Sequence, residues 1–284
     1  MKKTLRGKLF KAVTLLTVAA ACGATCVSLS GCAKTKSVSG EMHYVQWGTD
    51  YGIKVNVEVQ SDKKGDRIKK VTVADSDYVE ASDARGDWDP KVWYDSRQTL
   101  LNAYRGQYVS DILALEVITN GEVPLVKEDE EFVNYGDNLI ITGATLGSGR
   151  LLVAVQNALK TFDGYKVVEG EYGYNSWGTN YGAKVRVVLK DNVVKKVVRL
   201  SSGYCNATTG MPSWNPQLWN EKEDSILAAY AGKTVDQVLD MTATVEGQNG
   251  ATENSVSDSS LLATGATMSS ARLLLAVQNA LANA

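Results

Sequence analysis

The chain is poor in the residues that carry most metal and nucleophilic chemistry. Its 284 residues include one histidine, four cysteines, four prolines and three phenylalanines. Two of the cysteines lie in an apolar N-terminal segment, which leaves Cys32 and Cys205 for a processed chain. These residues cannot supply the clustered ligands of a zinc or iron–sulfur site, so we expect no metal. With Cys32 at the start of a processed chain, Cys205 would have no disulfide partner.

The chain also has little positive charge to offer an anionic partner. Its formal net charge is -2, and residues 1–31 contain five basic and no acidic residues. Loss of that segment would move the formal charge to -7. Because no basic run follows residue 31, the composition argues against nucleic acid as a partner.

The N-terminal segment has the pattern of a bacterial lipoprotein signal. A positively charged start precedes an apolar stretch over 12–27 that is too short to be a membrane span. Leu29-Ser30-Gly31-Cys32 follows and resembles a lipobox. We therefore expect residues 1–31 to be a signal peptide, Cys32 to be lipidated, and 32–39 to be a short tether. This predicts a protein held by lipid on the extracytoplasmic face of the cell membrane. The alternative is an ordinary secretory signal with a chance cysteine.

The rest of the chain reads as two copies of one unit. W-G-T-x-Y-G occurs at 47–52 and 177–182, W-x-P-x-x-W at 88–93 and 214–219, and T-G-A-T at 142–145 and 264–267. All six tryptophans fall into pairs in this way. Such a long repeat predicts two tandem homologous domains, at 40–162 and 165–284. His43 matches Gly173, so a histidine-dependent site cannot serve both copies, and we assign no catalytic residue.

Hydrophobic periodicity predicts an α+β fold in each copy. Alternating segments at 41–47, 53–60 and 67–75, and at 167–177, 183–190 and 193–200, indicate strands. Helical segments follow at 93–105, 109–116, 219–231 and 235–241. Each copy closes with an amphipathic helix directly after T-G-A-T. Strands followed by helices predict an antiparallel sheet packed with helices.

The T-G-A-T segments suit a bound phosphate. A glycine allows a tight turn, an alanine keeps bulk away, and the last threonine stands at the helix start. The unpaired N–H groups and the dipole of a helix N-terminus attract anions. The simpler interpretation is a capped helix start with no ligand. Arg150 and Arg272 follow in the helices, where they could approach a phosphate, although a solvated helix face is the expectation for them.

T-G-A-T-x-x-S followed by an amphipathic helix resembles the FMN-binding domain family. This family includes the covalently flavinylated C and G subunits of sodium-pumping quinone reductases and Rnf complexes, and flavinylated lipoproteins of extracellular electron transfer. Its last Thr or Ser is esterified to the FMN phosphate by a flavin transferase. The resemblance implies attachment at Thr145 and Thr267. It also implies cofactor-binding roles for Thr142, Gly143, Ala144, Ser148, Thr264, Gly265, Ala266 and Ser270. The family usually has an aspartate six residues before the acceptor, where this chain has Leu139 and Leu261.

The function that the resemblance implies is electron transfer through two covalent FMN groups. The donor would be a membrane quinol or NADH dehydrogenase system, and the acceptor an extracellular one such as ferric iron. Trp47 and Trp177 could wall the flavin ring; the alternative is that the paired tryptophans are core residues that define the fold. The chain would be a carrier and a substrate of a flavin transferase, not a stand-alone enzyme. The alternative function is a non-redox surface lipoprotein, a binding or adhesion module in which T-G-A-T only caps a helix. A variant of that alternative is a scaffold that binds flavin non-covalently.

Overall fold

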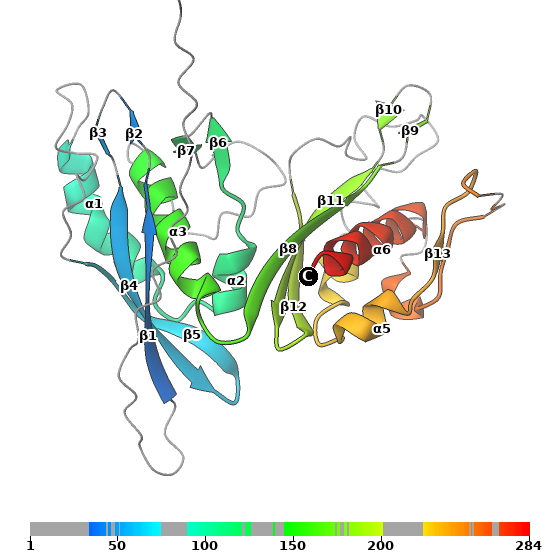
Figure 1. Cartoon of the computed structure of the whole chain (residues 1–284), viewed down its shortest axis with the longest axis horizontal. Helices are drawn as coiled ribbons and strands as arrows, with labels where there is room; N and C mark the ends of the chain where they lie inside the picture. The colour runs from blue at the N-terminus through cyan, green and yellow to red at the C-terminus, as the bar shows by residue number, and fades with distance from the viewer. Residues whose placement is uncertain are drawn as a thin grey trace, which may run out of the picture.

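Two three-stranded antiparallel sheets, each crossed by a long helix, dominate the fold (Figure 1). The computed structural model describes residues 34–43, 45–46, 49–50, 52–74, 90–120, 123–125, 139, 145–173, 175–176, 179–180, 182–200, 224–249, 251, 253–262 and 267–284. The architecture is mixed α+β, with antiparallel sheets packed by helices, as the sequence predicts.

The N-terminal sheet has the strand order β1-β4-β5. Its strands are β1 (Lys34–Met42), β4 (Ile53–Asp62) and β5 (Gly65–Val73). Every second residue of β4 from Ile53 to Val59 is buried, and the residues between them are polar, which is the pattern of a sheet covered on one face. Strand β1 begins earlier than expected, inside the predicted tether. The reason is backbone pairing, because Lys34 to Met42 match Ser61 to Ile53 without interruption.

The C-terminal sheet has the equivalent order β12-β11-β8. Its strands are β8 (Tyr165–Tyr172), β11 (Ala183–Lys190) and β12 (Val193–Arg199). The predicted ranges for β11 and β12 are confirmed to within one residue. The turn between these strands uses positive φ at Asp191 and Asn192, residues that tolerate the left-handed conformation.

Two 16-residue helices close the two cores. They are α3 (Thr145–Lys160) and α6 (Thr267–Ala282). Helix α3 packs on β1 and β4, and α6 packs on β8 and β11. The predicted apolar stripes are buried, with exposed fractions of 3% or less at Leu151, Leu152, Val155, Ala158, Leu159, Leu273, Leu274, Val277, Ala280 and Leu281.

Shorter elements complete each half. They are α1 (Pro90–Ala103), α2 (Val109–Ala114), a helical turn at 224–228, α5 (Val235–Leu239) and the 3-10 turn η3 (Ser259–Leu261). Four small hairpins are β2 (Val45–Gln46) with β3 (Thr49–Asp50), β6 (Ile118–Asn120) with β7 (Val123–Leu125), β9 (Asn175–Ser176) with β10 (Thr179–Asn180), and β13 (Ala243–Thr244) with β14 (Ser255–Val256). Gly106 and Gly232 end equivalent helical segments at φ of 85° and 86°, as expected for helix C-caps.

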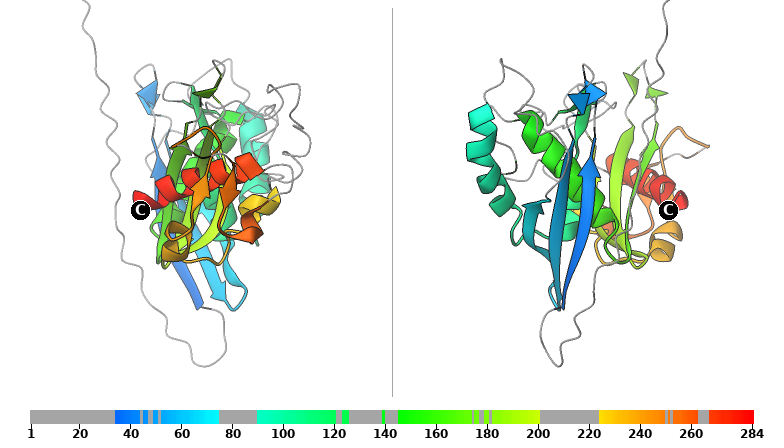
Figure 2. Two further views of the ribbon diagram at one scale, coloured as in Figure 1. Left: turned by 90° about the vertical axis from the view of Figure 1, so that its right-hand side faces the viewer. Right: turned by 60° about the vertical axis from the view of Figure 1, so that its left-hand side comes forward.

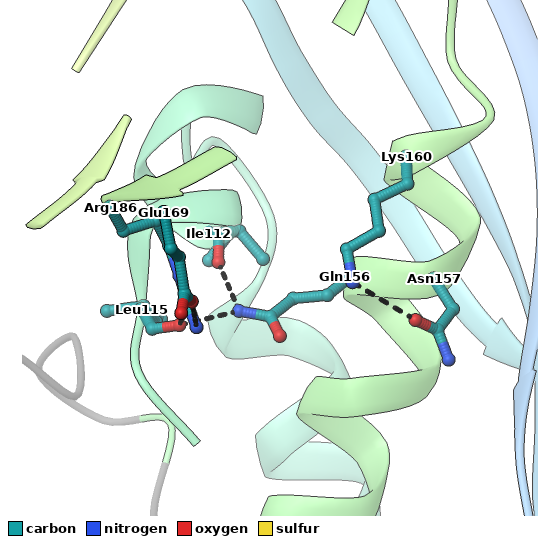
Figure 3. A network of polar contacts seen from close by, with 7 residues as sticks. All are labelled: Ile112, Leu115, Gln156, Asn157, Lys160, Glu169 and Arg186. Carbon is teal, nitrogen blue, oxygen red and sulfur yellow. Dashed lines mark hydrogen bonds and ion pairs between the residues drawn. The ribbon is translucent and has the colours of Figure 1, made fainter. Parts of the chain in front are cut away.

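A glutamine on each closing helix binds the end of the short helix beside it. Gln156 Nε2 donates to the carbonyl oxygens of Ile112 and Leu115, at 2.8 and 2.9 Å (Figure 3). Gln278 Nε2 does the same for α5 and the residues after it, with its shortest bond, 2.7 Å, to Met241 O. The last carbonyls of a helix lack donors further along it, so each glutamine adds a donor at the helix end. Some of these carbonyls, such as those of Ile112 and Val238, also accept from a backbone N–H.

The two halves pack against each other through the outer face of the C-terminal sheet (Figures 1 and 2). Helix α2 contacts β11 and β12, and Val188 of β11 belongs to the N-terminal core. Arg186 bridges the halves, because it donates to Leu115 O and pairs with Glu169 of its own sheet at 2.8 Å (Figure 3). Lys196 pairs with Asp111 of α2, also at 2.8 Å. In the part of the chain that the structure describes, no helix has the length and apolar character to cross a membrane.

Candidate functional site

The last threonine of each T-G-A-T segment is the first residue of a closing helix. Thr145 begins α3 and Thr267 begins α6, where Thr267 is half-buried. The sequence predicts them as N-caps, but they lie one position further in. The first helical residue also has an N–H group without an intrahelical acceptor, and helix ends are defined only to within a residue or two. Both threonines therefore still stand where a helix offers unpaired donors and a positive dipole end.

A buried serine follows each of these threonines. Ser148 and Ser270 have no exposed surface, and each has an interaction partner within the fold. Residues three apart share a helix face, so each serine lies on the same side of its helix as the threonine before it. Gly147 and Gly149 flank Ser148 and are also buried, which shows how closely the first turn of α3 is packed.

An arginine in the second turn of each helix is buried, and the expectation of a solvated face is wrong. Arg150 is 0% exposed and Arg272 is 4% exposed, and both have interaction partners. The error arose because charge alone suggested exposure, whereas the neighbouring leucines turn this side of the helix toward the core. A guanidinium keeps its charge at any physiological pH, even where it is buried. Each closing helix thus carries a fixed positive charge near its N-terminus.

The positions that would hold an aspartate in the resembled family are core positions here. Leu139 is 1% exposed and Leu261 has no exposed surface. The acid nearest to the second site, Asp258, pairs with Lys233 at 2.8 Å and accepts a hydrogen bond from Ser260 N at 2.8 Å. These bonds from Lys233 and Ser260 lower the pKa of Asp258 to about 2. Asp258 therefore caps the 3-10 turn η3 that follows it.

Other predicted residues lie outside the part of the chain that the structure describes. These are Cys32, Trp47, Thr142, Gly143, Ala144, Trp177, Thr264, Gly265 and Ala266. Thr145 is described only as the first residue of α3. Among the described residues there is no group of three or more potential metal ligands.

Two tyrosines have fully buried hydroxyl groups, which the sequence analysis does not predict. Tyr104 and Tyr230 occupy equivalent positions and have no exposed surface, and within the described part of the chain neither hydroxyl has a hydrogen-bond partner. Burial raises the pKa of both phenols. The repeated A-Y-x-G segment was the available signal. Their rings fill the cores beside the sheets, which is a structural role.

No protein family, curated protein or solved structure matches the chain.

Proposed function

We propose that the protein is a lipid-anchored electron-transfer flavoprotein with two tandem FMN-binding domains. One FMN would be joined through a phosphoester to Thr145 and the other to Thr267. The protein would relay electrons from a membrane quinol or NADH dehydrogenase system to extracellular acceptors such as ferric iron. The observation that supports this most is that the same T-G-A-T segment leads into the first residue of two equivalent 16-residue helices.

The surroundings of the two threonines suit a phosphate group. The first N–H groups of α3 and α6 can donate to phosphate oxygens, and the dipole of each helix favours a negative charge there. Ser148 and Ser270 lie one helical turn further on, and the charge of a buried arginine stands in the second turn. When bound, FMN supplies the redox chemistry, while the chain fixes its position and excludes water. An ester bond would also keep the flavin from being lost outside the cell.

The proposed organisation is residues 1–31 as a lipoprotein signal peptide and domains at 40–162 and 165–284. Lipid on Cys32 would leave only Ala33 before strand β1, which begins at Lys34. The N-terminal sheet would then lie directly at the membrane surface, without a flexible linker. The partners would be the flavin transferase, the membrane donor and the extracellular acceptor.

Intact-mass measurement with in-gel flavin fluorescence tests this proposal. The full-length chain is expressed with and without an active flavin transferase, and the protein is denatured before fluorescence is read. Fluorescence that survives denaturation, with a mass gain of two FMN less two waters, is the expected result. No gain in mass, with the transferase shown to act on a control substrate, would reject covalent flavin and favour a binding module.

A further inference from the structure

A positively charged groove of about 570 Å³ lies between strand β5 and helix α1. The charged residues that line it are Glu58, Lys69, Lys70, Arg97 and Arg105. Lys69 Nζ lies 3.5 Å from a carboxylate oxygen of Glu58. Lys70 and Arg105 are exposed, and neither makes an ion pair with another residue in the described ranges. The groove therefore has excess positive charge on a chain whose formal net charge is -2.

The sheet side of this groove is the counterpart of a face that already binds a helix. In the N-terminal sheet Lys70 pairs in register with Glu58, and in the C-terminal sheet Lys196 pairs in register with Val188. Lys70 and Lys196 therefore occupy equivalent places. Lys196 holds Asp111 of helix α2 at 2.8 Å where the two halves meet. A lysine at this place in the fold thus already binds a carboxylate from a helix.

Helix α5 is the counterpart of α2, but among the described elements no pair of strands packs on it as β11 and β12 pack on α2. Both helices are held by the equivalent glutamines, Gln156 and Gln278. Leu113 of α2 is 1% exposed, whereas its counterpart Leu239 of α5 is 40% exposed. Leu239 is one of two large hydrophobic residues that the structure finds exposed in its described part. An exposed leucine on a short helix is typical of a surface that another element covers.

The charges around Leu239 complement the groove. Asp236 and Asp240 lie on either side of Leu239 in the sequence, both exposed, and neither pairs with a described cation. Helix α1, which forms one wall of the groove, lies at one end of the long axis of the molecule, and α5 lies toward the other end (Figure 1). The excess positive charge of the groove is thus matched by the negative charge around Leu239, and the two surfaces lie toward opposite ends of the molecule.

We infer that α5 of one molecule docks into the groove of a second copy of the chain. The contact joins the same sheet face and the same short helix as the contact that α2 makes within each molecule, but it uses other acids, because the counterpart of Asp111 in α5 is Gln237. Asp236 and Asp240 face the groove cations, and Leu239 lies against the groove between them. Because the two surfaces differ, the contact is heterologous and forms rows or rings. It needs no flavin, so it stands apart from the proposed function.

The contact between molecules should be weaker than the contact of α2 within the molecule, because the two sheets differ in their outward-facing residues. Val188 and Val198, which pack against α2's half of the molecule, have Glu58 and Thr72 as counterparts in the groove. The intermolecular contact therefore depends more on charge and less on apolar burial. Such contacts are reversible and weaken as salt screens them.

Size-exclusion chromatography with light scattering tests this, using the full-length protein in one detergent at several concentrations and two salt concentrations. We expect species heavier than the monomer at micromolar concentration and low salt. Lys70→Glu and Asp240→Lys should each weaken association at least tenfold. An equal mixture of the two variants should associate again, because the intact groove of one meets the intact helix of the other. Lys63→Glu, in an exposed turn, is the control and should associate like wild type.

Three results would overturn the inference. One is a wild-type protein that stays monomeric at low salt at every concentration. Another is association that persists in both single variants, which would assign it to a different surface. The third is a wild-type protein that stays monomeric and sediments with vesicles of anionic phospholipid, while Lys70→Glu does not sediment. That result would assign the groove to a lipid surface. Circular dichroism of each variant establishes that loss of association is not loss of folding.

Discussion

Gly40 of strand β1 lies directly against Ala158 of helix α3. A Cβ atom placed on Gly40 would fall 2.2 Å from the backbone nitrogen of Ala158 and 2.3 Å from the carbonyl oxygen of Ala154. Gly170 has the same relationship to Ala280, with 2.2 Å to its nitrogen. Each closing helix therefore approaches its sheet through a glycine, and the neighbouring asparagine, Asn157 in α3, fixes this approach by donating to Glu41 O at 2.9 Å.

Replacing Gly40 or Gly170 by alanine should destabilise the protein strongly. The added methyl group would overlap helix backbone, which cannot move aside as a flexible side chain can. We expect the free energy of unfolding to fall by about 3 kcal/mol, at the upper end of overpacking effects. Urea unfolding followed by circular dichroism measures it. Gly173→Ala is the matched control, since nothing lies within 4 Å of its added Cβ. Equal stability of Gly40→Ala and Gly173→Ala would contradict the close approach.

The repeat made much of this fold predictable, because each element could be found twice. The strand predicted at 183–190 coincides with β11, because alternation at a period of two is a local property of the sequence. The burial of Arg150 was not predictable, because the side of a helix that faces the core depends on the partners packed around it. Strand β1 was misjudged for a similar reason. Lys34 to Ser37 are exposed and have no apolar signal, and only their pairing with β4 makes them a strand.

The contact between the halves was the least predictable feature. It depends on outward-facing residues such as Val188, which breaks the alternation expected of a solvent-facing sheet side, and Arg186, which keeps the alternation but donates to Leu115 O of the other half. The counterparts in the first repeat, Glu58 and Asn56, are polar. The difference between the two copies at these outward positions indicates the contact. A search for what the two copies share does not find it. The same is true of the candidate site, where the threonines were found because they are repeated.

Asp66 should make stability depend on pH. Burial alone would raise the pKa of Asp66, but bonds from Lys190 at 2.5 Å, Ser61 and Tyr165 outweigh burial and lower it below 3.8. The folded state therefore favours the ionised form. This contribution is present above pH 4 and is lost as the pH falls below it.

Asp66→Asn should accordingly lower the free energy of unfolding by about 2 kcal/mol at pH 7, less than for a fully buried pair because the Lys190 side chain is 25% exposed. The difference between wild type and variant should shrink at pH 3. Denaturant unfolding at both pH values gives the measurement. A difference that is the same at pH 7 and pH 3 would show that Asp66 does not titrate with folding.

Two tyrosine-to-phenylalanine changes should differ in their effect on stability. Tyr165 donates to Asp66 Oδ2 at 2.9 Å, whereas the buried hydroxyl of Tyr104 has no hydrogen-bond partner in the described part of the chain. Loss of a bond to a charged group should cost Tyr165→Phe about 2 kcal/mol. Tyr104→Phe removes an unsatisfied polar group and should leave stability unchanged or raise it by up to about 1 kcal/mol. Thermal unfolding of both variants compares them directly, and a marked loss in Tyr104→Phe would reveal a partner for its hydroxyl.

The glutamines that bind the ends of the short helices should contribute to the free energy of unfolding. Gln278→Met keeps the length of the side chain but leaves the carbonyl oxygen of Met241 without its 2.7 Å donor. We expect a loss of about 1 kcal/mol in unfolding free energy, at the low end of the cost of an unsatisfied acceptor, because Met241 is only half-buried. Gln60→Met, on the outer face of the N-terminal sheet, is the control. Hydrogen exchange at α5 should also rise in Gln278→Met, and an unchanged rate there would mean that α5 is held by other contacts.

The proposed flavin attachment makes a prediction that separates cofactor loss from misfolding. Thr145→Ala and Thr267→Ala should each remove one covalent flavin, seen as half the fluorescence of the denatured protein and a mass lower by one flavin group. Each threonine is the first residue of a helix, so losing its side chain should cost no more than about 1 kcal/mol of stability. Thr→Ser at either position should retain the flavin, because the hydroxyl that forms the ester remains. The three outcomes together distinguish an ester site from a helix start. A structural threonine would give full flavin in the alanine variants, whereas an ester site gives none at the altered position and full loading in the serine variants.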